Sequence, residues 1–123
     1  MSEVKTYLQA LMALEEAPLK LDPGQVIFSA GELGREMFIV RTGSVELRIG
    51  DTVVETVQQG GIFGELALVD AAPRTASAIA GADCTLVLVE QRSFSDLLRR
   101  VPGLGLEIMK VMARRLRKAN QVD

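Results

Sequence analysis

One short stretch of this 123-residue chain, residues 63–77, gathers side chains that can bind a small charged ligand. Arg74 can hold an anionic oxygen with two parallel hydrogen bonds, because its guanidinium is a planar fork of donors. Glu65 can accept a hydrogen bond from a hydroxyl group. Gly64 lets a ligand approach the backbone closely. The stretch therefore predicts a site for a small molecule that carries both hydroxyl groups and a negative charge.

The composition argues against catalysis at this site. The chain contains no histidine, which removes histidine acid–base chemistry, the Ser-His-Asp triad and histidine metal ligands. Cys84 is the only cysteine, so a zinc site is not expected and no intrachain disulfide can form. An enzyme would have to use carboxylates, lysine or Tyr7, and no spacing singles out such a pair. We expect a binding protein without a metal or a cofactor, rather than an enzyme.

Length and charge set the broad class of the protein. A chain of 123 residues with 48% hydrophobic side chains fits one domain with a substantial core. A net charge of −2 gives no general attraction to nucleic acids or anionic membranes, so direct nucleic-acid binding is not expected. No apolar run approaches the roughly 20 residues of a membrane span. The start of the chain lacks signal-peptide features, and with one cysteine the expected location is cytoplasmic.

The first three quarters of the chain contain two kinds of pattern. Residues 1–16 place apolar side chains mostly at helical spacing, which predicts a short N-terminal amphipathic helix. Residues 17–90 hold short runs rich in valine, isoleucine and threonine with glycines between them, which predicts a β sandwich or barrel. Gly50-Asp51 predicts a tight hairpin within that region. The expected strands are 17–21, 25–28, 37–41, 44–49, 52–57, 75–79 and 85–89.

The C-terminal part, residues 91–123, is predicted to be helical. Pro102-Gly103 separates a helix at 91–100 from one at 104–120, because proline disfavours helical backbone in the residue before it. The second helix carries an apolar stripe, which favours a homodimer or a downstream protein partner, and a basic face, which complements the helix dipole. The stripe is Met109, Met112 and Leu116, and the basic residues are Lys110, Arg114, Arg115, Arg117 and Lys118.

Residues 63–77 closely resemble the phosphate-binding cassette of cyclic nucleotide-binding domains. This family includes bacterial catabolite activators, kinase regulatory subunits and nucleotide-gated channels. Its pattern is approximately F-G-E-aliphatic-A-L, a short spacer, and then P-R-x-A-[ST]. Upstream, residues 23–28 and 37–45 resemble the first strands of the family, so that the resemblance covers about residues 15–120. The residues that fit the cassette are Phe63, Gly64, Glu65, Leu66, Ala67, Leu68, Pro73, Arg74, Ala76 and Ser77.

The resemblance implies a mainly β fold with flanking helices. It implies an antiparallel, jelly-roll-like β-roll at 17–90, with an N-terminal helix, a short cassette helix and two C-terminal helices. It further implies that Glu65 binds the ribose 2′-hydroxyl and that Arg74 binds the cyclic phosphate. Backbone N–H groups complete the anion site, in keeping with the attraction of anions to a helix start. They come from Gly64, Leu66, Ala67 and Thr75.

The contacts to the base are less specific. A hydroxyl at the position of Thr75 is associated in the family with tolerance for guanine, yet it also occurs in cAMP receptors; Thr75 also fits an ordinary strand residue. cAMP is therefore the favoured ligand and cGMP the alternative. By the same resemblance, Arg115 aligns with a helix arginine that caps the base in channel-type domains, with Leu116 as an apolar alternative. Leu47, Ile49, Val57 and Phe63 are candidate walls for the base, and each fits ordinary core equally well.

These observations predict a cyclic nucleotide sensor that signals by rearrangement of its C-terminal helix. The alternative is an interaction or dimerisation module with a vestigial pocket that binds no nucleotide. Family members of that kind typically lose the carboxylate or the arginine of the cassette, and this chain has both Glu65 and Arg74. The sequence is compatible with a stand-alone sensor and with a fragment of a longer regulator or channel.

Overall fold

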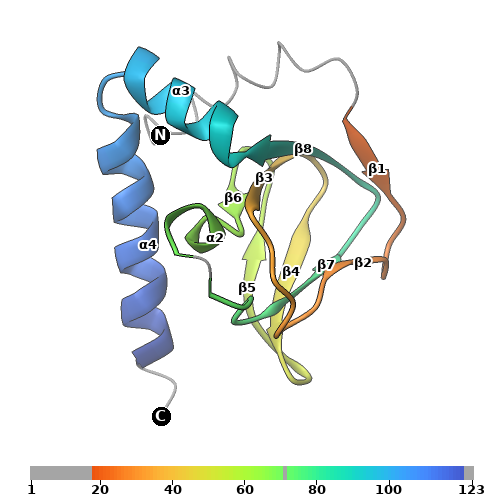
Figure 1. Ribbon diagram of the computed structural model, residues 1–123. Helices are drawn as coiled ribbons and strands as arrows, with labels where there is room; N and C mark the ends of the chain where they lie inside the picture. Colours follow the sequence, from red (N-terminus) through yellow and green to blue (C-terminus); the bar gives the residue numbers. More distant parts are fainter. Residues whose placement is uncertain (1–17, 71, 121–123) are drawn as a thin grey trace.

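The computed structural model describes residues 18–70 and 72–120, and the helix predicted at 1–16 lies outside them. Strands form the first part of the described chain and two longer helices form its end (Figure 1). In chain order the elements are β1 (Leu19–Leu21), β2 (Val26–Phe28), β3 (Glu36–Thr42), β4 (Val45–Ile49), β5 (Thr52–Val57), β6 (Ile62–Phe63), α2 (Leu66–Val69), β7 (Ser77–Ala80), β8 (Cys84–Glu90), α3 (Gln91–Arg100) and α4 (Leu104–Asn120).

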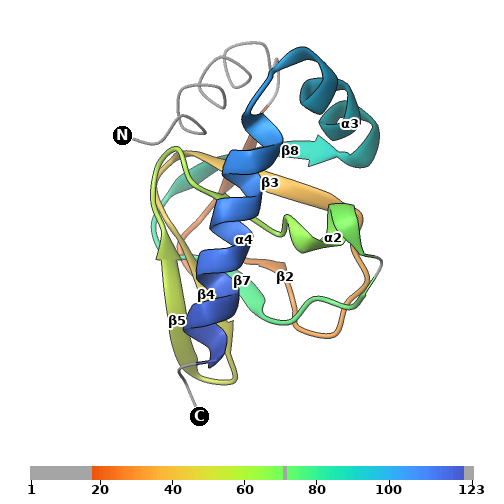
Figure 2. The ribbon, with the colours of Figure 1, turned by 90° about the vertical axis from the view of Figure 1, so that its left-hand side faces the viewer.

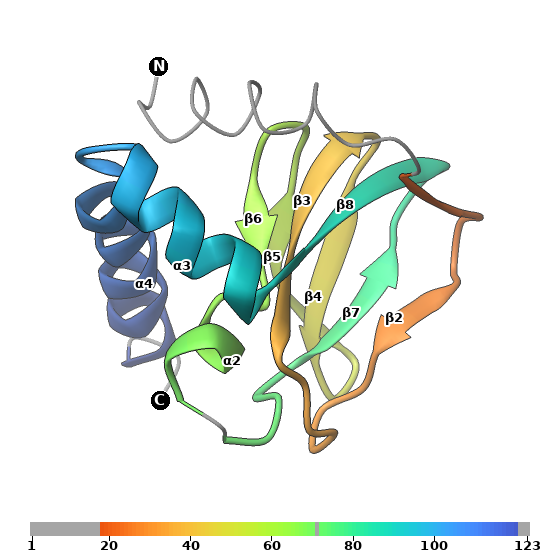
Figure 3. The same ribbon diagram turned by 45° about the horizontal axis from the view of Figure 1, so that its top comes forward.

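The strands make two four-stranded sheets with antiparallel neighbours. One sheet has the order β1-β8-β3-β6 and the other has the order β2-β7-β4-β5. The two sheets enclose a common interior, and α2, α3 and α4 gather at the side away from β1 and β2 (Figure 3). The predicted antiparallel β-roll with C-terminal helices is therefore confirmed. The hairpin predicted at Gly50-Asp51 is also confirmed, because Ile49 pairs with Thr52 across it.

Near the cassette one strand prediction was wrong and one strand was missed. The strand expected at 75–79 begins only at Ser77, because the chain before it is bonded to the β2–β3 loop. There the amide of Arg74 donates to the carbonyl of Glu32 at 2.8 Å, and the amide of Gly31 donates to the carbonyl of Arg74 at 2.8 Å. Strand β6 was missed, because two residues are too short to show an alternating pattern.

Strand β3 is buried on both faces and divides the core in two. Met37 and Ile39 face a cluster that α3 and α4 cover with Phe94, Leu104 and Ile108, among others. Phe38 and Val40 face the interior of the roll. Since successive side chains of a strand point to opposite faces, an uninterrupted apolar run is what a doubly covered strand requires.

Helix α4 runs along the open side of the roll, past α2 and the sheet that contains β4 and β5 (Figure 2). Its N-terminal half is anchored by apolar packing, with Leu104 and Ile108 buried and Met112 partly buried against the core. The apolar stripe expected on this helix is split, because Met109 and Leu116 are exposed while Met112 packs inward. None of the described helices is long and apolar enough to cross a membrane.

Candidate functional site

The site is built around the turn that joins β6 to α2. Gly64 lies in this turn with φ of 77°, a backbone conformation that side chains with a Cβ rarely adopt. Glu65 follows immediately and precedes the first helical residue, Leu66. The carboxylate residue Glu65 is only 3% exposed, and Arg74 is also buried. The turn therefore brings two buried charged residues of opposite sign to one place. Burying a charge costs free energy unless the group has hydrogen-bond or ion-pair partners, so partners are expected for both.

Arg74 has its partners on two neighbouring segments. Nη1 donates to the carbonyl of Gly64 at 3.0 Å, while Nη2 donates to the carbonyl and the carboxylate of Glu36 at 2.9 Å and 3.3 Å. The guanidinium also lies over the ring of Phe28, 4.2 Å from its centroid. Burial lowers the pKa of Arg74, and the Glu36 carboxylate partly offsets this effect. No described residue accepts a hydrogen bond from Nε, so this donor has no partner within the described part of the chain.

Two glycines make room for this guanidinium. A Cβ on Gly34 would lie 2.3 Å from Nη2 of Arg74, and a Cβ on Gly64 would lie 2.8 Å from Nη1. Contacts this short force the arginine to move. Gly34 looks like one more turn glycine in the sequence, so its role in seating Arg74 is visible only in the structure.

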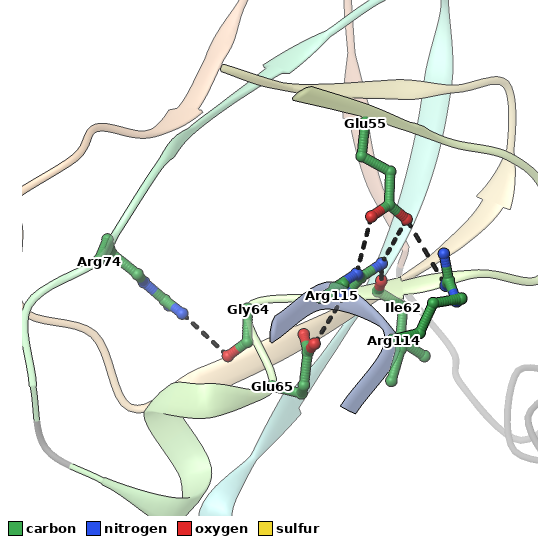
Figure 4. A network of polar contacts seen from close by, with 7 residues as sticks. All are labelled: Glu55, Ile62, Gly64, Glu65, Arg74, Arg114 and Arg115. Atoms are coloured by element: carbon green, nitrogen blue, oxygen red, sulfur yellow. Dashed lines mark hydrogen bonds and ion pairs between the residues drawn. The ribbon is translucent and has the colours of Figure 1, made fainter. Parts of the chain in front are cut away.

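The carboxylate of Glu65 points toward α4 and is engaged there. Its Oε1 accepts a hydrogen bond from Nη1 of Arg115 at 2.6 Å, a distance typical of charged pairs. Within the described part of the chain, no hydrogen bond reaches its second oxygen. Glu65 thus has one oxygen tied to the last helix and one available. In Figure 4, Arg74 and Arg115 lie on opposite sides of Gly64 and Glu65.

Arg115 joins three segments of the fold. Besides Glu65, its Nε and Nη2 donate to the two carboxylate oxygens of Glu55 on β5, both at 3.1 Å, and Nη2 also donates to the carbonyl of Ile62 (Figure 4). Arg114 adds a longer ion pair to Glu55 at 3.7 Å. Burial lowers the pKa of Arg115, but the charges and hydrogen bonds of Glu65 and Glu55 outweigh this and raise it. The hydrogen-bonding edge of Arg115 is therefore largely occupied, and its flat face makes none of these contacts.

The four residues predicted to line the base differ in how deeply they are buried. Val57 and Phe63 are buried in the interior core, and the Phe63 ring stacks on Phe38 with centroids 5.1 Å apart. Leu47 is half-buried against the same core. Ile49 is the last residue of β4, at the hairpin, and it is 55% exposed.

The remaining cassette residues lie at the edge of the site. Leu66 and Ala67 begin α2, and the amide of Ala67 donates to the carbonyl of Gly64 at 3.3 Å. Thr75 is exposed, beside Arg74 in sequence and just before β7. The contacts of the backbone N–H groups and of Thr75 with a nucleotide, which the resemblance implies, stay predictions.

Reasoning from the sequence missed Glu36, Gly34, Phe28 and Glu55. A signal for Glu55 exists in the sequence, because it stands two residues before the buried Val57 in a run of valines and threonines. Strand alternation places both residues on the inward face. No comparable pattern marks Glu36, whose main contribution is a backbone carbonyl. Among residues 18–70 and 72–120, no group of three or more acidic residues, histidines or cysteines is arranged to hold a metal ion.

Comparisons with known proteins show the family of this chain. Residues 18–101 match the family described as "Cyclic nucleotide-binding domain". The cyclic AMP receptor protein of Thermus thermophilus is 33% identical over 115 residues, which cover 89% of this chain and 53% of that protein. The chain thus spans about half the length of this relative. The present chain belongs to the cyclic nucleotide-binding domain family.

Solved structures support the same fold. The crystal structure of the Thermus thermophilus catabolite activator protein superposes with a TM-score of 0.78 at 28% identity, covering 94% of this chain and 56% of that one. A chain from work described as "A cyclic-GMP-dependent signalling pathway regulates bacterial phytopathogenesis" gives a TM-score of 0.76, also at 28% identity. That match covers 89% of this chain and 91% of the other.

Proposed function

We propose that this protein binds a cyclic nucleotide as a sensor, with cAMP as the favoured ligand. The observation that carries the proposal is the pair of buried charges at the Gly64 turn. Arg74 keeps Nε unused, and Glu65 keeps one carboxylate oxygen unused, as far as the described residues go. The first group suits a phosphate oxygen and the second suits a sugar hydroxyl. A cyclic nucleotide presents both on adjoining parts of one rigid molecule.

The base then falls on the Arg115 side of the site. Phosphate, ribose and base follow one another in the ligand, and Arg74, Glu65 and Arg115 follow one another in the protein. Because Arg115 uses its edge on Glu65, Glu55 and Ile62, it would meet the base with its face, a contact that guanidinium groups make readily. Such stacking fits any purine. The choice between cAMP and cGMP then depends on other contacts, with Thr75 as one candidate.

The support for cAMP is the Thermus thermophilus relative, which is described as a cyclic AMP receptor protein. cGMP is the alternative ligand, supported by the structural neighbour described with a cyclic-GMP-dependent pathway. The output of the sensor is carried by α4, since Arg115 connects that helix to Glu65. Catalysis has no part in the proposal, and the absence of direct nucleic-acid binding stays a prediction from the net charge of −2.

The second candidate is an interaction module that binds no nucleotide. It is favoured by the exposed apolar side chains of Leu106, Met109 and Leu116 on α4. Isothermal titration calorimetry of the purified protein with cAMP, cGMP and 5′-AMP separates the two functions. We expect saturable binding of cAMP, or of cGMP, well above that of 5′-AMP, which lacks the ring phosphate. Absence of heat and of thermal stabilisation with both cyclic nucleotides at millimolar concentration would refute the sensor.

A further inference from the structure

Glu55 is a partly buried acidic residue that the binding roles described above do not need directly. It lies on β5 opposite Leu47 of β4, and cross-strand partners share one face of a sheet. That face is the inward one, since Leu47 packs against the interior core. The Glu55 side chain is only 13% exposed. A carboxylate in such surroundings is costly unless it is paired, and its partner is Arg115.

The bond between Glu55 and Arg115 fixes the orientation of the guanidinium. Two parallel hydrogen bonds, from Nε and Nη2, join it to the two carboxylate oxygens. A bidentate pair of this kind sets the plane of the group as well as its position. Nη1 is the nitrogen that remains, and it is the one that reaches Glu65.

Apart from the two carboxylates, the carbonyl of Ile62 is the one other group among the described residues that accepts a hydrogen bond from Arg115. Along residues 113–118 of α4, every residue except Arg115 is exposed. An open cavity of about 710 Å³ borders this stretch, between α4 and the segment that connects β5 to β6. The C-terminal turns of α4 are therefore held to the roll by charged hydrogen bonds, not by apolar packing.

We propose that Glu55 is a positioning residue for the ribose subsite, acting through Arg115 on Glu65. Glu55 orients Arg115, Arg115 holds one oxygen of Glu65, and the other oxygen of Glu65 is presented to the sugar 2′-hydroxyl. Arg115 also offsets the negative charge of Glu65 beside the phosphate. This inference rests on the proposed function, because it concerns the same nucleotide site.

If Glu55 positions the ribose subsite, the affinity that the ligand gains from its 2′-hydroxyl should depend on Glu55. The test compares the dissociation constants of cAMP and 2′-deoxy-cAMP by calorimetry. In the unsubstituted protein we expect cAMP to bind about tenfold more tightly, the value of one hydrogen bond to a charged group. In Glu55→Gln the ratio should fall to within about threefold of unity, because cAMP weakens while 2′-deoxy-cAMP changes little. Arg115→Gln should give the same collapse, and combining the two substitutions should add little to either.

Glu46→Gln is the matched control. Glu46 is an ion-paired glutamate on the neighbouring strand β4, but its partner is Arg48 and, among the described residues, it has no hydrogen bond or ion pair to α4. Its ratio should equal that of the unsubstituted protein. Glu55→Asp keeps the charge and should retain part of the preference for cAMP over 2′-deoxy-cAMP. It replaces Glu55→Gln in the test if that variant folds poorly. Equal weakening of both nucleotides in the Glu55 and Arg115 variants, or an unchanged ratio, overturns the positioning role. Binding of neither cAMP nor cGMP by the unsubstituted protein refutes instead the proposed function.

Discussion

Arg115 of α4 donates a hydrogen bond of 2.6 Å to Glu65, the carboxylate that follows the Gly64 turn. The last helix of the described chain is thus joined directly to the cassette. A ligand can shift a conformational equilibrium only through differential contacts with the two states. Because the helix and the proposed ribose subsite share one carboxylate, a ligand on Glu65 has such a contact, and α4 is the element expected to respond.

Loss of this connection should loosen the end of α4. Arg115→Gln leaves Glu55 and Glu65 without their shared cation, and the free energy of unfolding should fall by roughly 2 kcal/mol. Arg114→Gln is the matched control, since Arg114 is 55% exposed and lies 3.7 Å from Glu55, a surface pair worth at most about 1 kcal/mol. Chemical denaturation gives the two values. Hydrogen exchange should show faster exchange in residues 113–118 of Arg115→Gln alone. Equal effects of the two substitutions would contradict a special role for Arg115.

Arg74 should dominate the affinity for the phosphate. Arg74→Lys keeps a positive charge but loses the planar fork and the contacts to Gly64 and Glu36. We expect the dissociation constant for cAMP to rise about 100-fold, because the Nε donor is lost and a hydrogen bond between charged groups is worth up to about 3 kcal/mol. Thr75→Ala, at an exposed position beside it, should change the constant by no more than about threefold. Comparable losses in the two variants, measured by calorimetry, would show that Arg74 does not bind the phosphate.

The sequence was most informative where a local pattern determines a local structure. Most of the short strands between glycines, the Gly50-Asp51 hairpin and the break at Pro102-Gly103 each follow from neighbouring residues, and each is found in the structure. The cassette resemblance placed Glu65 and Arg74 in one motif, and the structure buries both beside Gly64.

Contacts between distant segments could not be predicted in the same way. Arg74 packs against Gly34 and donates a hydrogen bond to Glu36, and Glu55 pairs with Arg115. These contacts depend on how segments that are remote in the sequence pack together. For the same reason the hydrogen bonds of Arg115 to two carboxylates were not predicted from the sequence. The position of an ion pair within a fold is a tertiary property that residue spacing does not encode.

The close approach of Gly34 to Arg74 gives a prediction of its own. Gly34→Ala places a methyl group 2.3 Å from Nη2, so the guanidinium must leave its place over Phe28. The expected cost is about 1–3 kcal/mol in the free energy of unfolding, as for other overpacked sites, together with weaker cAMP binding. Gly105→Ala serves as the control, because its added Cβ meets Leu98 at an ordinary 3.5 Å and alanine favours helix. If Gly34→Ala is as stable as Gly105→Ala, Arg74 does not need this space.

Acid should weaken the network at Glu55 in a defined direction. Its carboxylate faces Arg115, Arg114 and Lys118 of α4. Burial raises the pKa of Glu55, but the hydrogen bonds and charge of Arg115, with the charges of Arg114 and Lys118, outweigh burial and lower it. A carboxyl group whose pKa is lower in the folded state stabilises the fold above its unfolded pKa, about 4.3 for glutamate. That contribution is lost as the pH falls through the folded value.

Thermal unfolding of the protein and of Glu55→Gln between pH 7 and pH 3 measures this loss. Glutamine cannot titrate, so the variant lacks the contribution at every pH. The difference in Tm between the two proteins should be constant above about pH 5.5, where glutamate is ionised in both the folded and the unfolded state. It should shrink as the pH falls below about 4.3, because only the unsubstituted protein then loses the bond between Glu55 and Arg115. Tm curves that stay parallel down to pH 3 would mean that the charge of Glu55 does not hold α4 to the roll.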